Sequence, residues 1–115
     1  MRDYDFRKIE EKWRAQWVAN KTYHVEEDEK KEKFYVLNMF PYPSGAGLHV
    51  GHIRAFSSME VIARKKRLEG YNVLFPIGYD AFGLPTENYA MQTKQHPRIV
   101  TDRNIKQFEK QLKQV

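Results

Sequence analysis

Apolar and polar residues recur along this chain with spacings that predict helices at both ends and two short strands between them. From Asp5 to Ala19, bulky apolar side chains return every three or four residues, as in an amphipathic helix, and Asp5 is a suitable N-cap. The next charged segment, residues 26–33 (EEDEKKEK), is expected to be a solvated, mobile connector. We expect four side chains of the first helix to dock on a core: Phe6, Ile9, Trp13 and Trp17.

Two apolar runs rich in strand-forming residues flank a second helical pattern. Residues 34–39 (FYVLNM) and 71–77 (YNVLFPI) predict buried parallel strands. Residues 40–47 (FPYPSGAG) contain two prolines and two glycines and predict a loop. A helix is expected from about His52 to Glu69, closed by Gly70, which gives one right-handed βαβ crossover. Its expected inward-facing residues are Ile53, Phe56, Met59, Ile62 and Ala63.

Two more helices are expected after the second strand, one beginning near Pro85 and one near Thr101. The second pattern is still periodic at Val115, and a sheet of two strands leaves its edges unpaired. We therefore expect a piece of a larger nucleotide-binding fold. In it, residues 1–33 form an N-terminal helix and connector, and residues 34–115 form the N-terminal half of a catalytic domain. The last helix is expected to present Ile105, Phe108 and Leu112 on one face.

Composition narrows the class of protein. The 115 residues include 20 Lys/Arg and 15 Asp/Glu, a formal net charge of +5. This modest basic bias is compatible with a phosphate-bearing partner but is too small for a dedicated DNA-binding protein. The chain has no run of eighteen apolar residues, no apolar signal-peptide core at its start and no cysteine. We therefore expect a cytoplasmic protein without a membrane partner, disulfides or thiolate metal sites.

Distinctive residues follow both expected strands, where ligands bind in open parallel sheets. His49 and His52 lie three residues apart at the expected helix start, where free N–H groups and the helix dipole favour anions. Their imidazoles could donate to phosphate oxygens, and Gly51 would let a flat base or ribose approach the backbone. The same two histidines could instead cap the helix or bind zinc, although no third ligand is evident nearby.

Asp80 follows the second expected strand and is the other chemically distinctive residue. Its carboxylate could accept a charge-assisted hydrogen bond from a substrate ammonium, or could instead form an Asx-turn or cap a helix. Met39, Phe40 and Tyr42 could line an apolar pocket for a small aliphatic side chain, or could simply pack beneath the loop. The basic run at residues 64–67 (RKKR) is expected to face the helix dipole and remain solvated.

Three motifs taken together resemble one known family. Residues 39–45 (MFPYPSG), 48–52 (LHVGH) and 78–87 (GYDAFGLPTE) resemble the N-terminal part of the leucyl-tRNA synthetases, which are class I aminoacyl-tRNA synthetases. The HVGH tetrad is similar to the HIGH signature, which related nucleotidylyltransferases also carry, whereas the two flanking motifs are far more specific. The resemblance extends from about residue 4 to the end of the chain and covers only the first part of a family member.

The resemblance implies an incomplete Rossmann-like (HUP-type) α/β fold that binds leucine and ATP, the latter with Mg²⁺. His49 and His52 would contact the phosphates and the activating transition state, with Gly51 near the adenine or ribose. Asp80 would hold the leucine ammonium, and no protein metal site is implied. The implied reaction makes leucyl-adenylate and pyrophosphate and then transfers the leucyl group to tRNA(Leu) in the full-length enzyme. The implied leucine-pocket residues are Met39, Phe40 and Tyr42.

The chain also departs from the family pattern. Residues 55–57 (AFS) stand where Asn-Tyr-Thr is usual, Tyr79 replaces a tryptophan, and Thr86 replaces an alanine. The second ATP-binding signature, which closes over the triphosphate, is missing. We therefore expect these residues to be inactive alone and to act with the remaining part of a longer or split enzyme. Two alternatives stay open, namely another HxGH nucleotidylyltransferase and a non-catalytic binding or assembly module.

Overall fold

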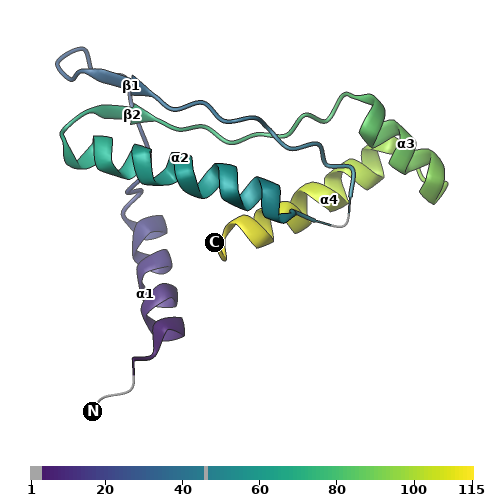
Figure 1. Ribbon diagram of the computed structural model, residues 1–115, viewed down its shortest axis with the longest axis horizontal. Coiled ribbons are helices and arrows are strands. Elements are labelled where there is room, and N and C mark those ends of the chain that lie inside the picture. Colours follow the sequence, from purple (N-terminus) through teal and green to yellow (C-terminus); the bar gives the residue numbers. More distant parts are fainter. Residues whose placement is uncertain (1–3, 46) are drawn as a thin grey trace.

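The computed structural model describes residues 4–45 and 47–115, which form four helices and two short strands (Figure 1). The order of the elements matches the sequence prediction, and none of the helices in the described residues is both long and apolar enough to cross a membrane. In chain order the elements are α1 (Phe6–Ala19), β1 (Lys33–Tyr35), α2 (Val50–Leu68), β2 (Asn72–Leu74), α3 (Leu84–Thr93) and α4 (Pro97–Leu112).

A parallel βαβ unit forms the centre of the molecule. β1 and β2 pair in parallel, with Phe34 opposite Val73, and α2 lies along them and joins them (Figure 1). Two further backbone hydrogen bonds extend the pairing beyond the assigned strands, from Asn72 N–H to the Glu32 carbonyl (2.8 Å) at one end and from Val36 N–H to the Leu74 carbonyl (2.9 Å) at the other. The predicted strands at 34–39 and 71–77 are therefore too long, and both chains continue as extended segments without a regular ladder. Proline at positions 41, 43 and 76 removes donors that a longer ladder would need.

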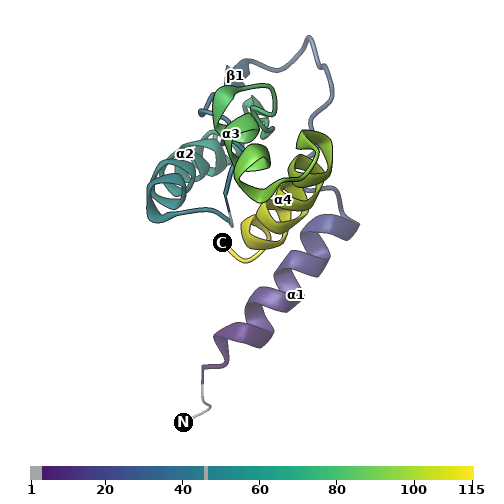
Figure 2. The ribbon, with the colours of Figure 1, turned by 90° about the vertical axis from the view of Figure 1, so that its right-hand side faces the viewer.

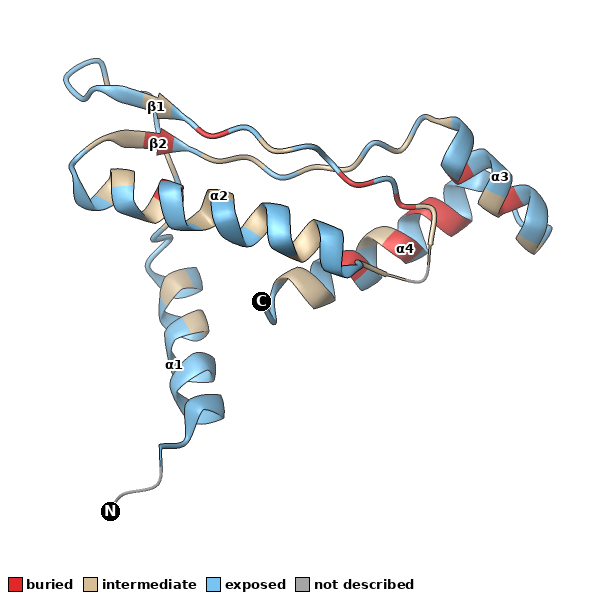
Figure 3. Ribbon diagram, in the orientation of Figure 1, coloured by how far each residue is buried: buried red, intermediate tan, exposed pale blue. Residues whose placement is uncertain are grey.

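The buried residues form small groups (Figure 3). One lies between the strands and α2, where Val36, Ala63 and Val73 are buried and Phe34, Met59, Tyr71 and Phe75 pack around them. Others lie on α3 and α4, which contact each other. The buried apolar residues of these two helices are Ala90, Val100 and Phe108.

α2 begins earlier and buries less than its sequence pattern predicted. It starts at Val50, with His49 as the N-cap, because the His49 side chain satisfies an N–H group of the first turn. Ala63 is its only fully buried residue, and Ile62, expected to face inward, is 41% exposed. The predicted end at Gly70 is confirmed, since Gly70 has φ +93° directly after the C-cap Glu69.

α1 projects away from the rest of the molecule, as Figures 1 and 2 show. Its N-cap is confirmed, because the Asp5 carboxylate accepts a hydrogen bond from Lys8 N–H (3.2 Å). The predicted docking on a core is wrong for this helix, since none of its fourteen residues, all of which the structure describes, is buried. Trp13 is 46% exposed, and Trp17 is half-buried against the ring of Tyr23, 5.6 Å between ring centroids.

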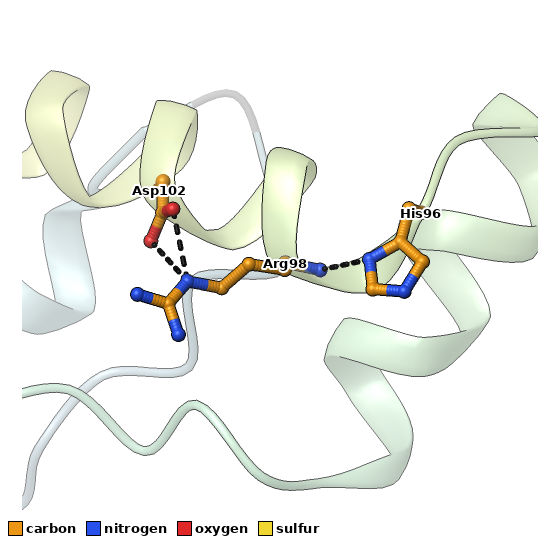
Figure 4. A network of polar contacts seen from close by, with 3 residues as sticks. All are labelled: His96, Arg98 and Asp102. Atoms are coloured by element: carbon orange, nitrogen blue, oxygen red, sulfur yellow. Dashed lines mark hydrogen bonds and ion pairs between the residues drawn. The ribbon is translucent and has the colours of Figure 1, made fainter.

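α4 begins at Pro97 instead of near Thr101. His96 is the N-cap, and its Nδ1 accepts a hydrogen bond from Arg98 N–H (3.2 Å), while proline needs no such partner at the first helical position. The Arg98 Nε donates to both carboxylate oxygens of Asp102 one turn later (3.0 and 3.2 Å; Figure 4). These local contacts start the helix before its apolar periodicity becomes visible in the sequence.

Candidate active site

The segments that follow the two strands meet beside a single hollow. The backbone N–H of Asp80 donates to the carbonyl of Pro41 (3.0 Å), which ties the loop after β2 to the loop after β1. The open hollow beside this contact has a volume of about 680 Å³, within the range of small-molecule sites. The predicted leucine-binding residues Met39, Phe40, Tyr42 and Asp80 all line it, together with Leu37, Asn38 and Tyr79.

The hollow has largely apolar walls and one carboxylate. The Phe40 ring packs against Gly78 so closely that a Cβ at this glycine would lie 2.9 Å from Phe40 Cε2. The glycine before Tyr79 and Asp80 therefore makes room for an aromatic wall. Asp80 is exposed and, as the only acidic residue among the described residues that line the hollow, can attract a cation at this edge.

His49 and His52 form a stacked pair at the start of α2. Their ring centroids are 3.8 Å apart with an interplanar angle of 24°. The Nδ1 atom of His49 accepts from Gly51 N–H (3.1 Å), and the Nδ1 atom of His52 accepts from His49 N–H (3.2 Å). A neutral imidazole with an accepting Nδ1 carries its proton on Nε2. The two capping bonds therefore leave Nε2–H as the donor of each ring.

The surroundings of His52 favour its neutral form. Burial lowers the pKa of His52 below its usual value, and the neighbouring His49 lowers that pKa further. The ring also stacks on Phe56 of the next turn (5.9 Å between centroids) and lies 6.4 Å from the ring of Phe108. His52 is thus flanked by the rings of Phe56 and Phe108 and accepts a hydrogen bond from the backbone N–H of His49.

α4 contributes three residues that the sequence analysis did not assign to the site. Asn104 Nδ2 donates to the carbonyl of Pro43 (2.8 Å), and Gln111 Oε1 accepts from Leu48 N–H (2.8 Å). Phe108 lies between these two residues along the helix and approaches both His52 and Tyr79, the latter at 6.2 Å between centroids. Phe108 was recognised only as part of an apolar helical face. Nothing in the local sequence indicated that two amides on this helix reach a loop 61 and 63 residues away.

Tyr79 connects the hollow to α4. Burial raises the pKa of its phenol, and the nearby Glu109 carboxylate raises it further. The hydroxyl therefore stays protonated at neutral pH and can donate a hydrogen bond. Tyr79 lines the hollow, and the ring of Phe108 lies near the rings of both Tyr79 and His52. Phe108 therefore lies between a residue of the hollow and the histidine pair.

The basic run on the last turns of α2 makes specific contacts. Lys65 and Lys66 pair with Glu69 (3.1 and 2.8 Å), while the Arg64 guanidinium lies 4.7 Å from the Trp17 ring centroid. Arg64 and Arg67 also lie 5.0 and 4.9 Å from the ring of Tyr23. The expected purely solvated face is therefore wrong for the two arginines, which contact α1 and the segment after it.

Across the described parts of the chain, no group of three or more His, Cys, Asp or Glu side chains is arranged to hold a metal ion. Both Nδ1 atoms of the histidine pair are engaged in capping bonds. This arrangement suits hydrogen-bond donation by the imidazoles.

Comparison with known proteins identifies the class. The family model for class I tRNA synthetases (I, L, M and V) matches residues 12–115. The chain therefore belongs to the class I tRNA synthetases.

Within that family, the chain is similar to leucine–tRNA ligases. The leucine–tRNA ligase of Bacteroides thetaiotaomicron is 60% identical over 113 residues, which are 98% of this chain and 12% of the relative. That of Alkaliphilus oremlandii is 55% identical over 97% of this chain and 14% of its own length. The resemblance inferred from the three motifs is thus confirmed, and the chain spans only 12 to 14% of these relatives.

A solved structure shows the same fold. The crystal structure of the Agrobacterium radiobacter K84 LeuRS–tRNA–LeuAMS ternary complex matches with a TM-score of 0.91 and 38% sequence identity. The match covers 97% of this chain and 14% of that chain. The predicted partial Rossmann-like α/β class is confirmed by this match and by the family model.

Proposed function

We propose that this chain is the part of a leucine–tRNA ligase that binds ATP and leucine for leucyl-adenylate formation, before the leucyl group passes to tRNA(Leu). The observation that carries the proposal is the hydrogen bond between Asp80 N–H and the Pro41 carbonyl. It joins the loops that follow the two strands beside one hollow, which the four leucine-binding candidates Met39, Phe40, Tyr42 and Asp80 line. The leucine–tRNA ligase relatives favour this reaction over that of another HxGH nucleotidylyltransferase.

In this proposal the leucine side chain occupies the apolar hollow and its ammonium binds the Asp80 carboxylate. Met39, Phe40 and Tyr42 enclose the aliphatic group and favour it by excluding water. A leucine carboxylate oxygen attacks the α-phosphorus of ATP, and the bond to the pyrophosphate leaving group breaks. Mg²⁺ would arrive bound to the nucleotide phosphates as part of the substrate.

The histidine pair binds the nucleotide phosphates. His49 and His52 donate through Nε2–H to phosphate oxygens and stabilise the negative charge that develops as pyrophosphate leaves. The N-terminus of α2 adds its dipole to the same charge. Gly51, in the first turn, lets the adenine or ribose approach the backbone.

We also propose that catalysis requires polypeptide beyond these 115 residues. The chain equals 12 to 14% of its relatives' length, and the described sheet has two strands, too few for an independently stable sheet. tRNA(Leu) would bind to the complete enzyme. In that enzyme, residues 1–33 would supply the N-terminal helix and connector, and residues 34–115 would supply the N-terminal half of the catalytic domain.

The test is leucine-dependent pyrophosphate exchange in a complete enzyme carrying this chain. Asp80→Asn keeps the side-chain shape but removes its charge, and we expect the KM for leucine to rise about ten- to hundredfold, the effect of losing a charge-assisted hydrogen bond. Asp102→Asn on α4 is the matched control, because this exposed carboxylate pairs only with Arg98 among the described residues. Near-normal leucine dependence in the Asp80 variant would refute the role of this residue.

A further inference from the structure

α4 holds the loop between β1 and α2 at two points. Asn104, only 4% exposed, donates to the carbonyl of Pro43, a residue whose side chain is itself fully buried. Seven residues later, Gln111 accepts from Leu48 N–H. A spacing of seven places both amides on the same face of a helix, two turns apart. Figure 1 shows α4 running back from α3 toward the beginning of α2. The middle of α4 contacts the loop at Pro43, and its C-terminal turn contacts the loop at Leu48.

The first of these contacts fixes the leucine side of the loop. Pro41 is held by the Asp80 N–H from the second strand end, and Pro43 is held by Asn104 from α4. Tyr42 lies between these two fixed carbonyls and lines the hollow. The direction in which its ring enters the hollow therefore depends on the Asn104 hydrogen bond.

The second contact fixes the nucleotide side. Leu48 directly precedes His49, the N-cap whose ring stacks on His52. The Gln111 amide also lies against Gly47, where a Cβ would be 2.6 Å from both Oε1 and Nε2. Gln111 thus contacts the backbone of Gly47 and Leu48 immediately before α2 begins. Through this backbone it orients the histidine pair.

We propose that Asn104 and Gln111 are positioning residues for adenylate formation, with Asn104 setting the leucine pocket through Tyr42 and Gln111 setting the phosphate-binding histidines through Leu48. This inference rests on the proposed function. Because the two residues act on different halves of the loop, their substitutions have different kinetic effects.

The experiment measures pyrophosphate exchange in a complete enzyme carrying this chain. Gln111→Met removes the acceptor at similar length, and we expect the kcat/KM for ATP to fall about three- to tenfold, with the KM for leucine nearly unchanged. Gln111→Glu keeps an oxygen that accepts from Leu48 N–H and restores the ATP dependence. Asn104→Asp lacks the donor, and it raises the KM for leucine by a similar factor while leaving the KM for ATP nearly unchanged.

Gln107→Met replaces a solvent-exposed glutamine of the same helix; it is the matched control and leaves both parameters unchanged. The melting temperature of each variant shows whether the enzyme is still folded. If the substitution of the buried Asn104 unfolds the enzyme, the Gln111 variants alone decide the test. Unchanged kinetics in Gln111→Met, or equal losses for both substrates without rescue by Gln111→Glu, would overturn the positioning role alone. A wild-type enzyme without leucine-dependent exchange would overturn the proposed function as well.

Discussion

His52 combines a capping role with the proposed phosphate-binding role through its two ring nitrogens. Its Nδ1 accepts from His49 N–H, and this bond requires an unprotonated Nδ1. Protonation of the ring would turn that acceptor into a donor facing another donor. The neutral ring is therefore favoured for two reasons, the capping bond and the partial burial that lowers its pKa. The neutral ring with its proton on Nε2 therefore supplies both the capping acceptor at the start of α2 and the donor that the proposed phosphate-binding role uses.

The first prediction concerns the titration of His52. Because its folded pKa is below the ordinary value of about 6.5, the folded state binds fewer protons than the unfolded state in this range. The associated stability is fully present above about pH 6.5 and is lost as the pH falls through the lower folded pKa. NMR titration of a complete enzyme carrying this chain, labelled at histidine Cε1, should show this shift. His52→Gln assigns the signal, and a midpoint above 6.5 would contradict the prediction.

At the scale of elements, the sequence predicted the order and type of every helix and strand because each has a local signal. The periodic apolar residues of α2 and Pro85 at the start of α3 are examples. The positions where the strands end could not be predicted from the sequence in the same way. Val36 still pairs with Leu74, but prolines follow in both segments. Whether a proline ends the pairing depends on which segment lies opposite it in the folded protein.

The candidate site was predictable where its residues are local in sequence and missed where they are distant. Asp80, Tyr42 and the histidine pair lie in the segments that follow the two strands, so the rule for parallel sheets located them. Asn104 and Gln111 reach the site only through the packing of α4, and an amide on a helix surface has no local sign of its distant partner. The exposure of α1 was also unpredictable, because periodicity indicates an apolar face but not what it contacts.

The second prediction concerns the end of α2. Gly70, at φ +93°, closes a Schellman motif in which its own N–H donates to the Arg67 carbonyl (3.0 Å) and Tyr71 N–H donates to the Lys66 carbonyl (3.1 Å). A Cβ here meets no atom within 4 Å, so Gly70→Ala introduces backbone strain without a clash, costing about 1 kcal/mol. Amide exchange at this helix end should accelerate about fivefold in a complete enzyme carrying this chain.

Gly45→Ala is the control for this experiment, measured by the same hydrogen-exchange mass spectrometry. A Cβ at Gly45 likewise meets nothing within 4 Å, but this glycine does not have positive φ. The two substitutions therefore differ mainly in backbone conformation. Equal exchange rates in both variants would show that the left-handed conformation of Gly70 contributes nothing to closing α2.

At the scale of the whole molecule, the described residues leave much apolar surface uncovered. Phe6 and Trp13 on α1 are 51% and 46% exposed, and Met39 at the hollow is 83% exposed. Uncovered apolar area of this kind usually marks an interaction surface. The chain matches only 12 to 14% of its relatives, so we infer that further polypeptide of the same enzyme covers this surface and completes the site around the hollow.

The last prediction follows from this incompleteness. The 115-residue chain alone should show no leucine-dependent pyrophosphate exchange, because it spans only 12 to 14% of its leucine–tRNA ligase relatives and its described sheet has only two strands. Mixing it with the separately produced remainder of the enzyme should restore exchange, since burial of the exposed apolar surface favours association. A mixture containing the Asp80→Asn chain controls for activity of the remainder and should exchange far more weakly. Exchange by the isolated chain at the rate of the complete enzyme would show that these residues already contain the whole catalytic site.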